Sequence, residues 1–457
     1  MATISCLCGS SRQSVTLSHR RAGVLTVTLC HCSTCRHVTG QLCTSYLGIS
    51  SSPTPSIRGL TSFSSPHSSR CWYFCATCGC HVFRSLASPK ETSKPAANNL
   101  NTSSAAQWEV STGVITHIPD HLYNDQATTQ DYTYRHIHVD NTKDGGLSIW
   151  LSGPTPTTSS PSPPSTAPIQ PDPDPTTKPP LPIGKEPSPS ATPNPDLLPA
   201  TCLCTTTSFS ISRPNPSSAL PRSNFPDLTH PYSLTPPSVV SNPDDVKWWL
   251  RDGITDHTAT NPTLTSPSIT TATSSTNDET PEHSNTRYRH RHRHRHRHRH
   301  RHRRRYLAGT CACRSCRLAS GFEIQSWAFI PRCNIVNPPS GMDSLPVSSL
   351  DPEDDLPASL PPQLQSYVSS SGVIRNFCRV CGATVFWHDR WRPDLVDVSV
   401  GLLDGGDGAR AEAWLEWWTG RLSFSEEATN GRTGGAARWA QRLAASLERG
   451  LKGDEAA

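Results

Sequence analysis

The feature that most constrains this chain is an ordered set of seven cysteines that occurs twice. In each half a C-x-C pair is followed by a C-x-C-x-x-C cluster and then by a C-x-x-C-G pair, so two sets of seven account for 14 of the 18 cysteines. The first set is Cys6, Cys8, Cys30, Cys32, Cys35, Cys75 and Cys78, and the second is Cys202, Cys204, Cys311, Cys313, Cys316, Cys378 and Cys381. An ordered duplication of this kind predicts two copies of one metal-binding module.

The redox compartment decides whether such cysteines bind metal or form disulfides. No apolar run near the N-terminus is long enough for a signal peptide, and no stretch of the sequence is long and apolar enough to span a membrane. We therefore expect a cytoplasmic protein, in which thiols stay reduced and free to bind metal. Zinc is the ion that cysteine pairs at these spacings favour.

The outer pairs of each set together supply a complete structural zinc site. In a C-x-C on a strand both thiols point to the same face, and in a C-x-x-C-G turn the glycine lets the backbone fold back at small steric cost. Four thiolates form the tetrahedral set of a structural zinc, which typically contributes roughly 10–16 kcal/mol to folding. The predicted ligands are Cys6, Cys8, Cys75 and Cys78 in the first module and Cys202, Cys204, Cys378 and Cys381 in the second.

The central C-x-C-x-x-C cluster has only three thiolates, and a zinc with three protein ligands keeps an open position that is typical of catalytic sites. Three thiolates give the site a net charge of −1, so it activates water poorly and holds a further thiol as a thiolate better. This predicts a small thiol substrate and a reaction that makes or breaks a carbon–sulfur bond. The predicted catalytic ligands are Cys30, Cys32 and Cys35, and Cys311, Cys313 and Cys316.

A fourth protein ligand would instead close a central site and make it structural. In the first module the candidates are His31, His37 and Cys43. The second module has Ala312 where the first has His31, so an open site is favoured more strongly there.

Composition divides the chain into segments. Only 34% of the residues are hydrophobic and 43 are prolines, so much of the length cannot be packed core. The net charge of +5 is local, because residues 287–305 hold eleven arginines, and it does not imply a nucleic-acid-binding surface elsewhere. We interpret the Arg-His tract as a low-complexity repeat, with metal or nucleic-acid binding as the alternative.

The predicted segments are a first zinc module (1–152), a disordered Pro-rich linker (153–200), a second zinc module (201–430) with a disordered insert (252–305), and a C-terminal helix (431–457).

Short apolar runs with a period of two predict a mainly β fold. The expected strands lie at 15–17, 24–29, 71–74, 81–83, 108–110 and 147–151, and at 327–330, 373–377, 384–387 and 395–400. Residues 414–424 are interpreted as a strand or a short helix. Residues 435–451 have a helical period and predict an amphipathic helix packed on the module.

The cysteine pattern resembles that of the glutathione-dependent formaldehyde-activating enzyme family, which also contains centromere protein V. The resemblance covers roughly 1–150 and 201–425, less the insert; one departure is Thr205, where the family usually has glycine. It implies two β-tent modules in tandem, each with a structural zinc on the outer pairs and a catalytic zinc on the central cluster. It also implies carbon–sulfur lyase chemistry, the formation of S-hydroxymethylglutathione from glutathione and formaldehyde.

Two further expectations follow. Arg36 and Arg317 each follow a central cluster and are candidates for binding a glutathione carboxylate, or alternatively for orienting the cysteine loop. The four remaining cysteines are expected to be buried as small hydrophobic residues. They are Cys43, Cys71, Cys80 and Cys333. The sequence thus predicts an enzyme acting on glutathione or a similar small thiol with an aldehyde, and the alternative is a non-enzymatic zinc scaffold that binds protein.

Overall fold

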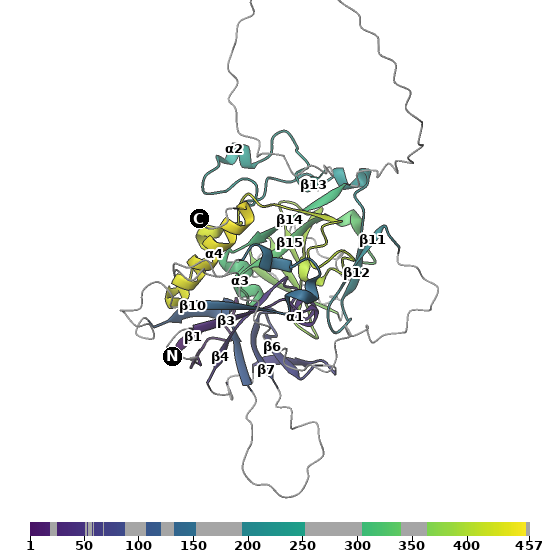
Figure 1. The fold of residues 1–457 in the computed structure, drawn as a ribbon. Coiled ribbons are helices and arrows are strands. Elements are labelled where there is room, and N and C mark those ends of the chain that lie inside the picture. The colour runs from purple at the N-terminus through teal and green to yellow at the C-terminus, as the bar shows by residue number, and fades with distance from the viewer. Residues whose placement is uncertain are drawn as a thin grey trace, which may run out of the picture. The chain divides into compact units, whose positions relative to one another are not determined.

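Two large sheets with the same order of strands organise the chain in the computed structural model (Figure 1). The structure describes residues 1–18, 25–50, 53, 57, 59–66, 68–86, 107–119, 132–151, 194–251, 304–339 and 363–453. Most of the predicted linker (153–200) and of the predicted insert (252–305) therefore lies outside the described residues. The mainly β class expected from the sequence is confirmed.

The first large sheet follows the order β10-β3-β4-β8-β7-β6-β5. Its strands are β3 (Leu25–Cys30), β4 (Thr44–Ile49), β5 (Leu60–Ser64), β6 (Arg70–Cys75), β7 (His81–Leu86), β8 (Gln107–Ser111) and β10 (Tyr132–Ile137). β10 is parallel to β3, and the other neighbours are antiparallel. Buried and partly buried residues alternate along β3, so one face of this strand covers the core.

The second large sheet follows the order β13-β14-β15-β20-β19-β18-β17, and β21 also pairs with β14. The path from β21 through β14 to β17 therefore repeats the order of the first sheet. Its strands are β14 (Arg305–Cys311), β15 (Gln325–Pro331), β17 (Leu364–Ser370), β18 (Val373–Cys378), β19 (Thr384–Asp389), β20 (Leu395–Ser399) and β21 (Leu415–Trp417), and β13 (Leu250–Arg251) also pairs with β14. β21 is parallel to β14, as β10 is to β3. Equal strand order in both halves is what two copies of one module would produce.

Two small sheets flank the outer C-x-C pairs. Both pairs lie in turns between two strands, and not on a strand as expected from the sequence. They contain β1 (Ala2–Ile4), β2 (Gln13–Val15), β9 (Ile115–Ile118) and β22 (Thr433–Gly434), and β11 (Leu197–Thr201), β12 (Ser208–Ser212) and β16 (Ile335–Val336). β11 begins at Leu197, so its first four residues lie within the predicted linker, which ends at 200. β22 comes from the second half of the chain and pairs in parallel with β9 of the first half.

The helices are short, apart from the last one. They are α1 (Ser33–Thr39), α2 (Pro237–Val240), α3 (Arg314–Ser320) and α4 (Gly435–Lys452), with 3-10 turns η3 (Thr112–Val114), η5 (Val139–Thr142), η6 (Gly146–Ile149), η7 (Pro216–Ala219), η8 (Arg332–Asn334), η10 (Val400–Leu402) and η11 (Ser425–Glu427). The predicted helix at 435–451 is confirmed as α4. No helix among the described residues is both long and apolar enough to cross a membrane.

The strand predicted at 147–151 is wrong, because this segment forms the 3-10 turn η6. Gly145 and Gly146 both have positive φ, and the Asp144 side chain accepts a hydrogen bond from the Gly146 N–H at 2.8 Å. These local features favour a turn over an extended strand. The predicted strand or short helix at 414–424 contains the three-residue strand β21.

The two halves pack against each other through reciprocal contacts at the ends of α1 and α3. The Gly401 N–H donates to the Gly40 carbonyl at 3.1 Å, and the Gly113 N–H donates to the Gly321 carbonyl at 3.0 Å. Gly40 and Gly321 are the C-cap residues of α1 and α3, and both adopt the left-handed conformation. The same contact thus occurs twice with the roles of the two halves exchanged, and one hydrophobic core runs through both.

Helix α4, yellow in Figure 1, packs on the first half of the chain, next to β10. The Tyr134 hydroxyl lies 3.0 Å from the Ser446 hydroxyl, and the Tyr134 ring meets the Trp439 ring edge-on. The predicted C-terminal helix therefore packs on the first module. It also contacts the second half, where Trp439 Nε1 donates to Glu323 at 2.9 Å and Glu448 accepts from the Leu422 N–H at 3.3 Å.

Candidate metal centres and active site

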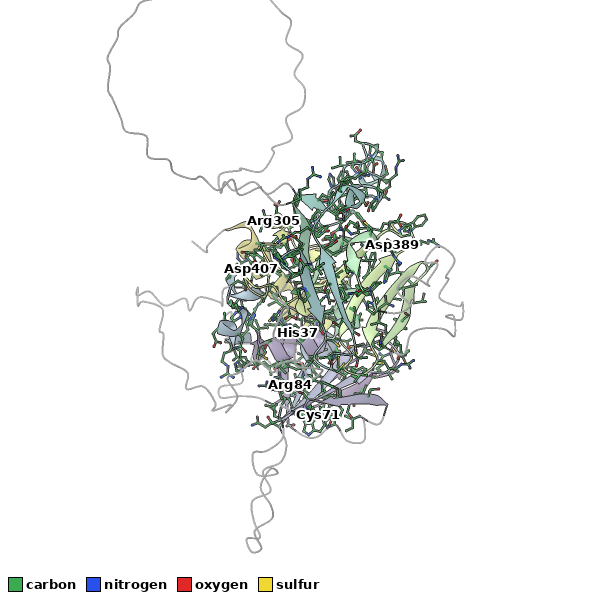
Figure 2. The ribbon with its side chains drawn as sticks, turned by 90° about the vertical axis from the view of Figure 1, so that its right-hand side faces the viewer. His37, Cys71, Arg84, Arg305, Asp389 and Asp407 are labelled. Carbon is green, nitrogen blue, oxygen red and sulfur yellow. The ribbon has the colours of Figure 1, made fainter. Side chains whose placement is uncertain are left out.

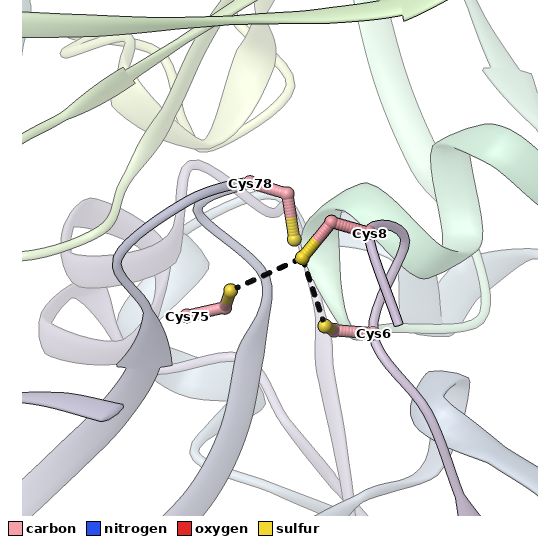
Figure 3. A group of neighbouring side chains, drawn as sticks. All are labelled: Cys6, Cys8, Cys75 and Cys78. Atoms are coloured by element: carbon pink, nitrogen blue, oxygen red, sulfur yellow. Dashed lines mark hydrogen bonds between the residues drawn. The ribbon is translucent and has the colours of Figure 1, made fainter. Parts of the chain in front are cut away.

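The outer pairs of each cysteine set come together as four-sulphur clusters. In the first cluster Cys8 Sγ lies 3.5 Å from both Cys6 Sγ and Cys75 Sγ, and Cys78 completes the group (Figure 3). Tetrahedral ligands with the usual Zn–S bond of about 2.3 Å are ~3.8 Å apart, so these sulphurs are spaced to hold one ion. Each pair comes from one tight segment, and the sheets bring the two pairs together.

The second four-sulphur cluster has the same construction. Cys202 Sγ lies 3.3 Å from Cys204 Sγ and 3.8 Å from Cys378 Sγ, and Cys381 is the fourth member. All four sulphurs lie within 4.8 Å of one another. The residues that sequence spacing assigned to two structural metal sites are therefore grouped as expected.

Each central cluster forms where a strand of the large sheet passes into a short helix. Cys32 is the N-cap of α1, and its sulphur accepts a hydrogen bond from the Cys35 N–H at 3.4 Å. Cys313 caps α3 in the same way, with 3.3 Å to the Cys316 N–H. The first cysteine of each cluster, Cys30 or Cys311, ends the preceding strand. The C-x-C-x-x-C spacing thus places three thiols around one point.

Neither central group includes a fourth metal-ligating residue among the described residues. The His37 ring is not part of the first central cluster. Its Nδ1 lies 2.7 Å from the Thr201 carbonyl and its Nε2 lies 3.2 Å from Asp404. His31 Nε2 lies 2.9 Å from His136 Nδ1 and 3.7 Å from Cys43 Sγ. The three candidates for closing the first site are thus engaged elsewhere or with one another.

In the first half an ion pair covers the central cluster. Arg84 Nη1 donates to Cys35 Sγ at 3.5 Å, while its Nε donates to Glu109 at 2.7 Å and its Nη2 contacts the same carboxylate. The guanidinium also lies 3.8 Å above the centre of the Tyr46 ring. Hydrogen bonds from Cys30 and Cys32, and then the charge of Arg84, lower the pKa of Cys35. The Glu109 carboxylate and the Cys35 sulphur therefore balance the charge of Arg84.

In the second half a different strand supplies the arginine. Arg375 donates from both terminal nitrogens to Cys316 Sγ at 3.6 Å and from Nη2 to Ser315 Oγ at 3.0 Å. Arg375 on β18 stands opposite Trp387 on β19, whereas in the first half Trp72 on β6 stands opposite Arg84 on β7. The arginine and the tryptophan of this pair have thus exchanged strands between the two halves. Trp387 of the second half occupies the position that the ion-paired Arg84 has in the first half.

A cavity of about 710 Å³ opens onto the central cluster of the second half, and all its lining residues fall between Ser223 and Glu427. Its lining includes the three cysteines and seven aromatic side chains. These are Cys311, Cys313, Cys316, Tyr232, Trp248, Trp327, Phe329, Trp387, Trp391 and Phe424. In Figure 2, Arg84 is labelled on the purple strands of the first half, and Asp389, another lining residue, is labelled on the green strands of the second.

Polar groups of the cavity wall could act on a substrate. Thr310 Oγ1 is buried and has no hydrogen-bond partner among the described residues. Burial raises the pKa of Asp397 to about 6, although Arg392 beside it at 2.8 Å acts in the opposite direction. A carboxyl group with a pKa in this range can take up and release a proton near neutral pH.

The two arginines singled out from the sequence do not line this cavity. Arg317 Nη1 donates to the Gly113 carbonyl at 2.5 Å and Nη2 to the Asn430 carbonyl at 2.8 Å, so it ties α3 to neighbouring backbone. Arg36 is buried in α1. Their contact with a substrate carboxylate stays a prediction. Sequence reasoning missed Arg375, whose one signal is a charge inside the apolar run 373–377.

The four remaining cysteines differ in exposure. Cys43 and Cys80 are buried as expected, and Cys71 is half-buried. The expectation is wrong for Cys333, which is exposed because the 3-10 turn η8 directs it outward from the end of β15.

The sequence of the first half matches a known family. Residues 1–111 match the model of the glutathione-dependent formaldehyde-activating enzyme family. The resemblance is thus confirmed for that segment, which carries the complete first cysteine set. No curated protein and no solved structure matches the chain. For the second half, the likeness to the family rests on the repeated cysteine order and the repeated strand order.

Proposed function

We propose that the chain is a zinc-dependent enzyme of the carbon–sulfur lyase type, which joins glutathione or a similar small thiol to an aldehyde. With formaldehyde the product is S-hydroxymethylglutathione. The observation that carries this proposal is the group of three cysteine sulphurs at the wall of a cavity in the second half. Three thiolates suit a site that holds a fourth sulphur and suit water activation poorly.

The residues of the second half have separate roles in this proposal. Cys311, Cys313 and Cys316 hold the zinc, which when bound stabilises the substrate sulphur as a thiolate. Arg375 donates to Cys316 and offsets part of the negative charge of the three thiolates.

The first half takes a structural role in this proposal. Its central cluster would hold a zinc through Cys30, Cys32 and Cys35, but Arg84 above it is already paired with Glu109. The two outer clusters hold one structural zinc each. Activity is therefore assigned to the second half, and the metal of the first half stabilises the fold on which the second half packs.

Cobalt substitution tests the proposal on the full-length protein. Glutathione is expected to change the sulphur-to-cobalt absorption bands, because its thiolate takes the open position, whereas S-methylglutathione has no thiol and is expected to leave them unchanged. The change should disappear in Cys313→Ser and persist in the matched Cys32→Ser. Equal spectral changes with both compounds would mean that the thiol does not coordinate, which would favour the non-enzymatic zinc scaffold.

A further inference from the structure

We infer that the cavity of the second half accepts aldehydes with a bulky apolar or aromatic substituent, in preference to formaldehyde. This inference rests on the proposed function and names the substrate class of the same site. The volume of about 710 Å³ lies within the range of roughly 300–1,000 Å³ that is usual for sites of drug-sized ligands. Formaldehyde, with only one carbon, would leave most of the wall without contact.

Aromatic side chains lie next to the reacting sulphur position. Trp327 clusters with the three cysteines of the central group, and Trp387 and Phe424 pack against this cluster. The carbon that accepts the sulphur must approach within bonding distance of it, so the substituents on that carbon meet these rings. For formaldehyde the substituents are hydrogen atoms, which gain little from three aromatic neighbours.

The charges of the cavity favour a neutral substituent. Four carboxylate residues and two arginines line it. They are Asp227, Asp389, Asp397, Glu427, Arg375 and Arg392. Arg392 is paired with Asp397 at 2.8 Å, and Arg375 donates to Cys316, so both guanidiniums already have protein partners. Of the carboxylates, Asp227 is paired with Arg421 at 3.1 Å. An anionic substituent would find no unpaired guanidinium at either lining arginine, whereas an apolar one would gain from burial against the aromatic wall.

The aromatic lining extends to exposed residues. Trp391 lines the cavity although 69% of its surface is exposed, and Tyr232 also combines lining with exposure. A large exposed tryptophan offers apolar area that a long substituent can cover. The strand pairing shows that Arg84 of the first half stands at the position equivalent to Trp387, and Arg84 is paired with Glu109. The first half therefore lacks the tryptophan that the aromatic wall of the second half has at this position.

The proposed step is an addition without redox change. A lone pair on the thiol sulphur forms a bond to the aldehyde carbon, the π bond of the carbonyl breaks, and its electrons move to oxygen. The oxygen takes up the proton that the thiol releases, so thiol plus aldehyde gives one hemithioacetal. The reverse reaction breaks the carbon–sulfur bond and returns both reactants, as expected of a lyase.

The test compares 3-phenylpropanal, propanal and formaldehyde as partners of glutathione with full-length, zinc-loaded protein. A second readout is independent of activity: titration calorimetry with 3-phenylpropanol, which has the same substituent and no electrophilic carbon. Trp391→Ala removes a lining ring that is mostly exposed, so the variant should fold. The control is Leu234→Ala, which removes an 80% exposed side chain outside the lining.

We expect kcat/KM to rise from formaldehyde to 3-phenylpropanal and 3-phenylpropanol to bind saturably. Trp391→Ala should weaken that binding about 2- to 10-fold, the equivalent of an aromatic contact of roughly 0.5–1.5 kcal/mol, and Leu234→Ala should not change it. The inference is overturned if formaldehyde reacts and 3-phenylpropanal does not, or if 3-phenylpropanol fails to bind or binds both variants equally. If no aldehyde reacts while 3-phenylpropanol binds through Trp391, the proposed function fails and the preference for an aromatic ligand is retained.

Discussion

The contact between the two halves at Gly321 can be tested by a pair of matched substitutions. Gly321 ends α3 with φ +88°, and a Cβ added there would lie 1.9 Å from the carbonyl oxygen of His81. Gly453 ends α4 in the same left-handed conformation, with φ +74°, and an added Cβ would meet nothing within 4 Å. An alanine at either position therefore pays the same cost for the left-handed backbone conformation. Only the alanine at position 321 also collides with a neighbouring atom.

The expected magnitudes follow from these two components. The left-handed conformation costs alanine roughly 1–2 kcal/mol, which is the whole effect expected of Gly453→Ala. In Gly321→Ala the backbone of the first half must also move away, and overpacking of this kind typically costs about 1–3 kcal/mol more. We therefore expect Gly321→Ala to lower the free energy of unfolding by about 2–5 kcal/mol.

Urea unfolding followed by tryptophan fluorescence measures both variants, with zinc content determined on the same samples so that metal loss is detected. If Gly321→Ala is no less stable than Gly453→Ala at equal zinc content, the halves do not pack at this point and the reasoning is refuted. Gly40→Ala supplies an internal check, since its Cβ would lie 2.2 Å from the Thr384 carbonyl oxygen in the reciprocal contact.

Three other outcomes are expected. Purified protein under reducing conditions should contain close to four zinc ions by elemental analysis, one for each cysteine cluster, and two or fewer would contradict the assignment. Cys378→Ser should unfold the second half by circular dichroism because it opens a closed four-sulphur site, whereas Cys313→Ser should keep the fold, since serine is a good N-cap, and lose activity. Glu109→Gln should lower the free energy of unfolding by about 2 kcal/mol or more, because it leaves the charge of Arg84 buried without its carboxylate. The control is Glu412, an exposed residue paired with Arg410. Glu412→Gln should change the free energy of unfolding by less than about 1 kcal/mol. Equal effects of the last two changes in chemical denaturation would show that Arg84 does not depend on Glu109.

Local spacing was enough to predict the cysteine clusters and about half of the strands of the two large sheets, whereas β4, β5, β10, β14 and β17 were not predicted. Each ligand pair lies within a segment of three or four residues, so its geometry follows from the strand or turn that carries it. The alternating run that becomes β3 and the helical period of α4 are likewise properties of one continuous segment. Such features depend on few contacts with distant residues.

The wall of the cavity in the second half could not be predicted in this way, because it depends on which strands become neighbours. Arg84 and Arg375 reach their clusters from different strands, and only the pairing of Trp72 with Arg84 and of Arg375 with Trp387 reveals that the two residue types have exchanged places. The interface role of Arg317 has the same origin, because its acceptor Gly113 lies 204 residues away in the sequence. No periodicity of a single segment contains that information.

The pairing of β22 with β9 has a consequence for the timing of folding during synthesis. The hydroxyl of Thr433 lies 2.7 Å from His117 Nδ1 across a separation of 316 residues, and α4 follows directly after this contact. At a translation rate of about 5–20 residues per second, the first half is complete as a polypeptide roughly 15–60 s before the segment that covers it is made. During that interval the nascent first half exposes the edge of β9 and the surface under α4, and a chaperone or early metal binding would protect these surfaces from aggregation.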